Sequence, residues 1–244
     1  MCIRDSYKAW LLAAAFLMPV GASAALTSYT DEAAFMAAVS SLGGATNTLD
    51  FDGPGTPAGT IIADNDVVEG IRFDYLFPFQ TDQLLVSDIY DTTSPNNFLG
   101  VNNGDDLIYN GDDFTMSFAG GVNALGFSII TAEEPYDGTN DLTATLYNAD
   151  IELEVDNNIV ASLDVDAAQD ILPDGSLVFF LGIVDPHNQF TKVNIKTFNP
   201  DPGNIFFTYN VDDIVTSVVP IPGAAWLFLS GLIGLFAARK KATP

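Results

Sequence analysis

The amino-acid sequence predicts a mainly β protein, an antiparallel β-sandwich with one short N-terminal helix. The first observation is a period of two, in which Phe114, Met116 and Phe118 alternate with Thr115 and Ser117. Successive side chains of a strand point to opposite faces, so such a segment buries one face and exposes the other. The second observation is that turn residues separate these segments at intervals of about 8–12 residues, which is typical of an antiparallel sandwich.

The helix is predicted near the start of this domain, over Thr27–Leu42. Thr30 or Asp31 can cap it, and an apolar stripe follows at helical spacing. Two glycines, Gly43 and Gly44, end it. We interpret it as a helix that packs at the edge of the fold.

From residue 47 onward the pattern indicates strands. Leu177–Val184 is apolar on both faces and is expected to be a central strand. Residues 56–66 are expected to form the longest loop, and short turns such as Asn103-Gly104 and Asn110-Gly111 separate other segments. The predicted strands are Asn47–Phe51, Gly70–Phe77, Leu84–Ile89, Phe98–Val101, Asp106–Tyr109, Phe114–Ala119, Ala124–Thr131, Leu142–Tyr147, Ile151–Val155, Asn158–Val165, Leu177–Val184, Lys192–Phe198 and Ile205–Val211.

Residues 1–24 have the pattern of a secretory signal peptide. Lys8 supplies a positive charge, Ala9–Val20 is apolar, and the sequence Ala22-Ser23-Ala24 predicts cleavage before Ala25. Residues 1–6 resemble a translated sequencing adapter and receive no biological weight. They include the single cysteine, so we expect neither a disulfide nor thiol chemistry in the mature protein.

The last segment, residues 218–244, combines three features. A proline break at Val219-Pro220-Ile221-Pro222 interrupts both strand and helix, and an uncharged, mostly apolar run of 18 residues follows from Ile221 to Ala238. This length is close to the ~20 residues of a membrane-spanning helix. Arg239, Lys240 and Lys241 then mark a cytoplasmic end. The segment is predicted to contain a single C-terminal transmembrane helix, which could serve either as a plain membrane anchor or as part of a sorting signal that is later cleaved.

The order of these features resembles the PEP-CTERM sorting signal of Gram-negative bacteria. The resemblance rests on V-P-x-P at Val219–Pro222, on Trp226-Leu227-Phe228, on Ser230-Gly231-Leu232 and on the basic tail. Ile221 stands where the family name has Glu. The resemblance implies that an exosortase, a membrane-bound processing protease, cleaves the tail. It implies export through the inner membrane, transient anchoring there, and a final place at the cell surface or outside the cell.

The domain between the two signals, residues 25–217, is strongly acidic. Of the 32 acidic and 8 basic residues of the chain, 31 acidic residues and three basic ones (Arg72, Lys192 and Lys196) fall within it, which gives a formal charge of −28. Nucleic acid is excluded as a partner, because phosphate binding requires a basic footprint. Its length suits one domain with a substantial core.

The two ends of this domain are expected to pair with each other. The opening segment Leu49–Gly53 and the closing segment Val211–Ile214 resemble strands of jelly-roll sandwiches, including carbohydrate-binding-module-like domains. Their pairing would bring together four carboxylates, those of Asp50, Asp52, Asp212 and Asp213. Since Ca²⁺ prefers oxygen ligands, a structural Ca²⁺ ion is the candidate cofactor; the alternative is an acidic surface facing solvent.

Two classes of function remain after this reading. The first is a structural or adhesive protein of an extracellular polysaccharide or biofilm matrix. The second is a carbohydrate-binding module, with Tyr75, Tyr90, Tyr109 and Tyr136 as stacking platforms. We expect no enzymatic activity, because no HExxH, G-x-S-x-G or P-loop motif is present. A secreted glycoside hydrolase is the weaker alternative, since it needs only two carboxylates.

Overall fold

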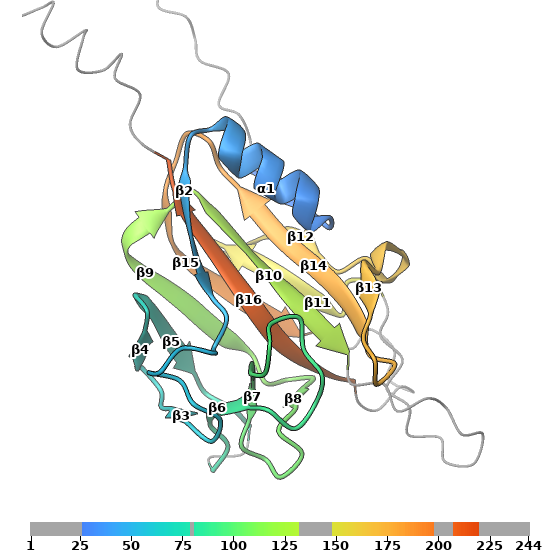
Figure 1. Ribbon diagram of the computed structural model, residues 1–244. Coiled ribbons are helices and arrows are strands. Elements are labelled where there is room, and N and C mark those ends of the chain that lie inside the picture. The colour runs from blue at the N-terminus through green and yellow to red at the C-terminus, as the bar shows by residue number, and fades with distance from the viewer. Residues whose placement is uncertain (1–25, 79–80, 132–147, 198–206, 220–244) are drawn as a thin grey trace, which may run out of the picture.

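The computed structural model of the chain describes residues 26–78, 81–131, 148–197 and 207–219, which form two antiparallel sheets and one α-helix (Figure 1). The larger sheet has ten strands in the order β1-β14-β10-β16-β7-β6-β3, with β13 beside β14 and with β2 and β8 beside β16. Its strands are β1 (Thr27–Tyr29), β2 (Ala45–Leu49), β3 (Ile61–Ile62), β6 (Leu84–Ser87), β7 (Phe98–Val101), β8 (Ile108–Tyr109), β10 (Ala124–Thr131), β13 (Asp170–Ile171), β14 (Leu177–Val184) and β16 (Thr208–Val218).

The smaller sheet has six strands in the order β12-β11-β15-β9-β5-β4 and lies behind the larger one in Figure 1. Its strands are β4 (Val67–Val68), β5 (Ile71–Tyr75), β9 (Phe114–Val122), β11 (Ile151–Val155), β12 (Asn158–Ser162) and β15 (Phe190–Thr197). A 3-10 turn, η1 (Val165–Ala167), links β12 to β13.

The two sheets pack face to face over one hydrophobic core. Phe73 and Phe114 from the smaller sheet and Leu125, Phe127 and Val211 from the larger one belong to one cluster and are each at most 1% exposed. The period-two alternation explains this, because every second residue of these strands is apolar and faces the other sheet. The prediction of a mainly β, sandwich-like antiparallel fold with one helix is confirmed.

The central strand of the larger sheet is β16, the last strand of the domain. It pairs with β10 along one side and with β2 on the other, where Ile214 lies opposite Leu49. The predicted pairing of the opening and closing segments is confirmed at this one position, since the rest of the ladder joins residues 45–48 to residues 215–218. The predicted end of this strand at Val211 is wrong, because β16 continues to Val218. A bulge between β10 and β16 accommodates Asp213, whose φ is 49°, so the strand passes through the two aspartates.

The helix α1 (Glu32–Ser41) covers the outer face of the larger sheet (Figure 1). Asp31 is its N-cap and accepts a hydrogen bond from the Ala34 backbone N–H at 2.6 Å. Phe35 packs above Gly126 and Gly182, which are register partners on β10 and β14. A Cβ at Gly182 would lie 2.8 Å from the Phe35 ring, so the two glycines make room for the helix. The helix was predicted to start at Thr27, but residues 27–29 form β1 instead.

Several short elements were not predicted. The expected loop over residues 56–66 contains β3, and β4 and β13 are two-residue strands that are too short to show a period. The predicted strand Leu142–Tyr147, the signal peptide and the segment from Pro220 onward lie outside the described residues. Within the described residues no helix has the length and apolar character needed to cross a membrane.

Both ends of the described domain lie at the same end of the sandwich. Thr27 pairs with Val184, Val184 with Ala124, and Ala124 with Ser217, so these residues form one row across the larger sheet. Directly after β16, the Val219 backbone N–H donates to the Asn123 side chain at 2.9 Å. The first residue of the V-P-x-P motif is therefore held against the folded domain.

Candidate ligand-binding cleft

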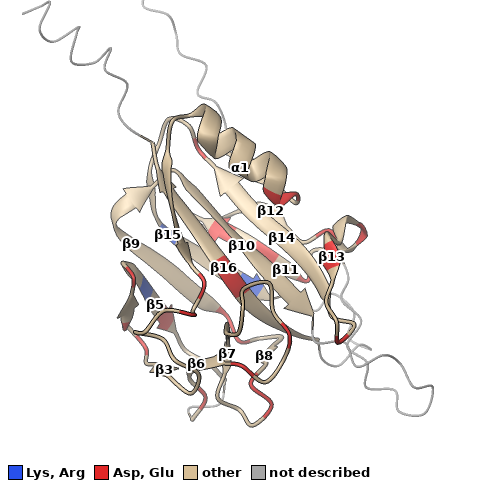
Figure 2. Ribbon diagram, in the orientation of Figure 1, with Lys and Arg blue, Asp and Glu red and all other residues tan. Residues whose placement is uncertain are grey.

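The outer face of the six-stranded sheet is polar. Its exposed positions alternate with core residues and form rows across the strands, because register partners point to the same side. One row contains Arg72, Ser117 and Lys192; the next contains Asp74, Thr115, Asn194 and Glu154; a third pairs Lys196 with Glu152. The three basic residues of the predicted domain all lie on this sheet, in β5 and β15 (Figure 2).

A cleft of about 480 Å³ opens at one end of this face, where β5 ends and β9 begins. This end is opposite to the chain termini, since β9 runs from Phe114 at the cleft to Val122, next to Asn123. The lining is mostly polar and consists of Asp64, Asn65, Asp74, Tyr75, Leu76, Gly111, Asp113, Phe114, Thr115, Asn194 and Lys196.

Hydrogen bonds between neighbouring strands hold the polar side chains of the cleft in place. Asp74 accepts from the Ser117 hydroxyl at 2.9 Å and forms an ion pair with Arg72 at 3.1 Å. Asn194 accepts from the Thr115 hydroxyl at 2.8 Å and donates its amide N–H to Glu154 at 2.7 Å. These two sets of bonds, which together span four strands, form what we call the polar ladder, and they constrain the orientation of its members before any ligand arrives.

The remaining carboxylates of the cleft are also engaged. Asp113 forms an ion pair with Lys196 at 3.1 Å and accepts from the backbone N–H and the hydroxyl of Thr197 at 2.9 and 3.0 Å. Asp64 accepts from the Tyr75 backbone N–H at 2.8 Å and from the Asn65 amide at 2.7 Å. A carboxylate offers about four acceptor positions, so each retains acceptor capacity for a ligand.

Two aromatic residues line the cleft beside the polar ladder, Tyr75 and the buried Phe114. Tyr75 stacks on Phe77 with ring centroids 4.4 Å apart, and its hydroxyl donates to the Ile62 carbonyl at 2.7 Å. Partial burial is the largest cause that raises the pKa of this hydroxyl, and the charges of Asp64 and Asp66 raise it further. Leu76, at the rim, is 92% exposed. The cleft thus combines a polar ladder with a small apolar surface.

The other predicted tyrosines do not join Tyr75 in the cleft. Tyr109 donates to the Asp105 carboxylate at 2.5 Å, and burial, this hydrogen bond and the nearby charges raise its pKa to about 12. Tyr90 stacks against Phe98 with centroids 6.1 Å apart. Tyr136 lies outside the described residues. The predicted set is therefore not a single site.

The predicted calcium ligands are divided between two environments. Burial raises the pKa of Asp213, and the charges of Asp50 and Asp52 add to this increase. Asp212 is turned elsewhere. Among the described residues, no group of three or more His, Cys, Asp or Glu side chains is arranged to hold a metal ion. The calcium site stays a prediction.

Asp212 is a fully buried carboxylate on β16 that anchors the loop between β6 and β7. It accepts hydrogen bonds from the Thr92 and Thr93 hydroxyls, and from the Ser94 backbone N–H at 2.9 Å. Its other oxygen accepts from the Asp213 N–H at 2.7 Å. Burial is the main cause that raises its pKa to about 7, and the Asp213 charge adds to it. Sequence reasoning missed this role, although a Thr-Thr-Ser run is a source of donors.

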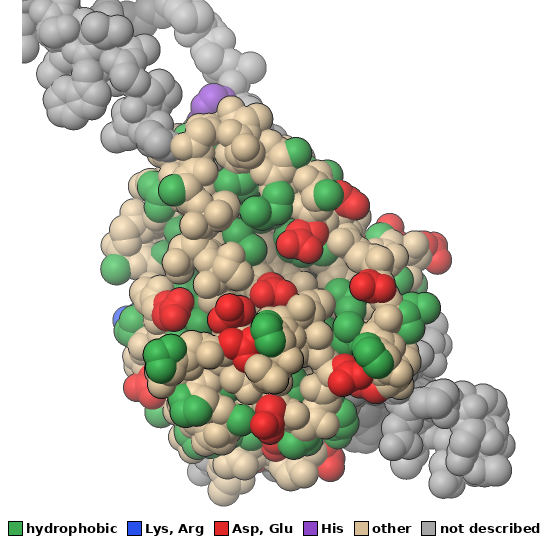
Figure 3. Space-filling model, in the orientation of Figure 1, with side chains coloured by type: hydrophobic (Ala, Val, Ile, Leu, Met, Phe, Trp, Pro, Cys, Tyr) green, Lys and Arg blue, Asp and Glu red, His purple; other side chains and the backbone are tan. Residues whose placement is uncertain are grey.

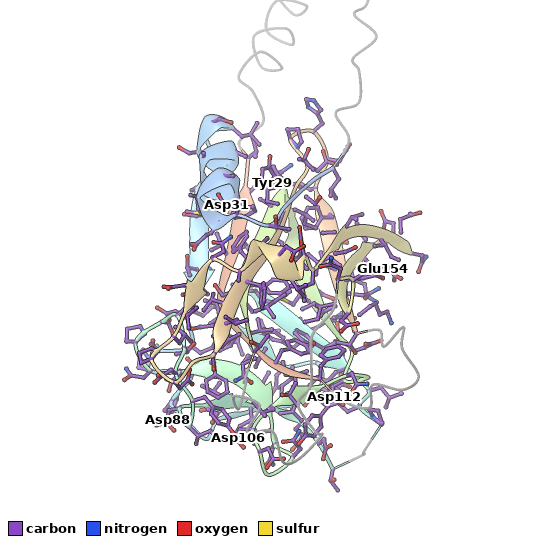
Figure 4. All side chains as sticks on the ribbon, turned by 90° about the vertical axis from the view of Figure 1, so that its right-hand side faces the viewer. Tyr29, Asp31, Asp88, Asp106, Asp112 and Glu154 are labelled. Carbon is purple, nitrogen blue, oxygen red and sulfur yellow. The ribbon has the colours of Figure 1, made fainter. Side chains whose placement is uncertain are left out.

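Acidic side chains dominate the charged groups on the rest of the surface. Figure 3 shows the outer face of the larger sheet, where carboxylates gather and blue atoms are visible at one edge. Figure 4 shows Asp88, Asp106 and Asp112 at the end of the molecule opposite Tyr29 and Asp31. Asp112 is 3% exposed, and burial raises its pKa to about 6 although the Tyr109 N–H donates to it.

No family model, no curated protein sequence and no solved structure matches this chain. The interpretation of the cleft therefore rests on the chemistry of its own residues.

Proposed function

We propose that this protein is an exported, non-catalytic β-sandwich that binds an extracellular polysaccharide through the cleft and has an adhesive role in a cell-surface or biofilm matrix. The observation that supports this most directly is the row of Asp74, Thr115, Asn194 and Glu154, in which Thr115 bonds to Asn194, Asn194 bonds to Glu154, and Asp74 is held by Ser117. Fixed carboxylate and amide groups in an open cleft suit the closely spaced hydroxyls of a sugar, since each hydroxyl both donates and accepts. Tyr75 and Leu76 add apolar surface for the C–H face of a sugar ring.

Binding is favoured over hydrolysis because the cleft carboxylates are each engaged by cations or hydrogen-bond donors. A glycoside hydrolase needs one carboxylic acid that keeps its proton and a second carboxylate across the scissile bond. In the cleft, Asp74 and Asp113 are instead each held in an ion pair, with Arg72 and with Lys196. These contacts support a binding role.

The proposal includes the route by which the protein reaches its place. A signal peptide would direct export in a Gram-negative bacterium, a C-terminal transmembrane helix would hold the chain at the inner membrane, and an exosortase would then release it. The position of the cleft agrees with this route, because it lies at the end of the sandwich opposite Thr27 and Val219. A ligand could then be bound while the chain is still anchored. We further interpret the sandwich as jelly-roll-like.

A panel of neutral and acidic matrix polysaccharides tests the binding role in pull-down and affinity-electrophoresis assays. We expect at least one polymer to bind, and Asn194→Ala to weaken that binding about tenfold or more, because it removes both the acceptor for Thr115 and the donor to Glu154. The control Asn158→Ala, on edge strand β12 and outside the cleft, should bind as the wild type does. If no polymer of the panel binds, or if both variants lose binding equally, the proposed site is wrong.

A further inference from the structure

We propose that the cleft selects an uncharged glycan and rejects chains that carry carboxylate groups. This inference rests on the proposed function and specifies its ligand class. Three carboxylates, from Asp64, Asp74 and Asp113, line the cleft, against the single ammonium group of Lys196. The local charge is therefore negative before any ligand binds.

The cations near the cleft are already paired. The Lys196 ammonium lies 3.1 Å from Asp113, and the Arg72 guanidinium lies 3.1 Å from Asp74. A ligand carboxylate would have to compete with a protein carboxylate for each of them. Both pairs are partly exposed, so they exchange with solvent, but a competing anion would leave Asp113 or Asp74 without its cation in an acidic cleft.

The third cation of this face is too far along the sheet to line the cleft. Lys192 lies opposite Ser117, two residues from Asn194 on the same strand. This separation is about 6.6 Å along a strand. Its side chain is not among those that line the cleft. Its charge still lies within one Debye length of the cleft, but Arg72, Lys192 and Lys196 together are outnumbered by Asp64, Asp74, Asp113 and Glu154, so the face remains negative.

The hydrogen-bonding capacity of the cleft leads to the same conclusion independently of net charge. Carboxylates are acceptors only, and the three in the cleft keep part of their acceptor capacity after their internal bonds are counted. The Asn194 amide and the Lys196 ammonium spend donors on Glu154 and Asp113. A ligand must therefore mainly donate. Sugar hydroxyls can do this, whereas a ligand carboxylate brings acceptors alone.

Matched polymers provide the test. Five neutral polysaccharides of different linkage, dextran and hydroxyethyl cellulose among them, are each compared with their carboxymethylated forms by affinity electrophoresis at about 0.15 M NaCl, where the Debye length is about 8 Å. We expect carboxymethylation to weaken binding about tenfold or more for the backbone that binds. The difference should shrink at about 1 M NaCl, where the Debye length is about 3 Å.

Two variants separate the cleft from the general acidity of the protein. Asp113→Asn frees the Lys196 ammonium and should recover severalfold affinity for the carboxymethylated polymer. Asp166→Asn removes an exposed carboxylate of η1 outside the cleft and makes the same change in net charge. It should leave the ratio of neutral to carboxymethylated binding unaltered. If a carboxymethylated polymer binds as tightly as its neutral form or more tightly, the proposed selectivity is wrong but the binding function stands. The same conclusion follows if the two variants change the binding ratio equally. Absence of binding to every polymer, in both forms, overturns the proposed function itself.

Discussion

Replacing Asp212 with Asn tests whether this buried carboxyl group makes the fold sensitive to pH. The side chain is 0% exposed and lies beneath the loop that β6 and β7 flank. The substitution preserves shape and one acceptor oxygen for the donors of Thr92, Thr93 and Ser94. It removes the second acceptor oxygen, which costs about 1 kcal/mol if the Asp213 N–H is left unpaired.

The magnitude follows from the pKa of Asp212, which rises from 3.8 to about 7 in the folded state, mainly through burial. Each pKa unit corresponds to about 1.4 kcal/mol, so the penalty for the ionised group is about 4 kcal/mol. The folded state binds more protons than the unfolded state between these two pKa values. The free energy of unfolding therefore falls as pH rises from about 4 to about 7, and it levels off above the folded pKa.

Urea unfolding at steps between about pH 4.5 and pH 8 measures this dependence. We expect the wild type to lose stability toward neutral pH and Asp212→Asn to show a clearly flatter curve, more stable than the wild type at pH 8. A residual slope of the same sign is expected from Asp112, whose pKa is about 6. Asp166→Asn, which removes an exposed carboxylate, should keep the wild-type slope. Parallel curves for the wild type and Asp212→Asn would refute the reasoning.

Three further results are expected. Gly126→Ala should lower the free energy of unfolding by about 1–3 kcal/mol, because the new Cβ would lie 2.5 Å from the Phe180 ring. The control Gly120→Ala should leave the urea midpoint unchanged, because its Cβ would have no heavy atom within 4 Å. Asn123→Ala removes the acceptor of the Val219 N–H and should speed hydrogen exchange at that amide about fivefold; an unchanged rate would show that the contact does not hold the segment. If the predicted calcium site forms, EDTA should lower the melting temperature and CaCl₂ should restore it, and an unmoved melting temperature would remove the prediction.

The sequence predicts best those strands whose pattern is decided by burial alone. Ala124–Thr131, Ile151–Val155 and Leu177–Val184 are found with the predicted bounds. The closing strand shows the limit, because the predicted strand ended at Val211 and the predicted closing segment at Ile214, whereas β16 continues to Val218. A carboxylate inside a strand becomes stable when donors from a distant loop reach it, and Thr92 lies 120 residues away in sequence. Local sequence carries no information on such a partner.

The cleft shows the same limit from another side. Alternation on β15 places Asn194 and Lys196 outward, and this much is readable from the sequence. Their neighbours are set by strand register, since Thr115 lies 79 residues from Asn194 in the chain. The prediction from tyrosines alone therefore selected scattered residues, of which Tyr75 lines the cleft. Side-chain type suggested a sugar site, but register determines which polar groups meet.

The scarcity of basic residues gains a structural meaning from their positions. In a domain with a formal charge of −28, a basic residue at an arbitrary surface position would only reduce the net negative charge. Instead Arg72 and Lys196 pair with Asp74 and Asp113, two carboxylates of the cleft. Partly exposed ion pairs add little stability, so this placement is better explained by orientation than by folding energy. The cations hold the carboxylates that a ligand would meet. Replacing Lys196 should therefore alter binding far more than it alters the urea midpoint.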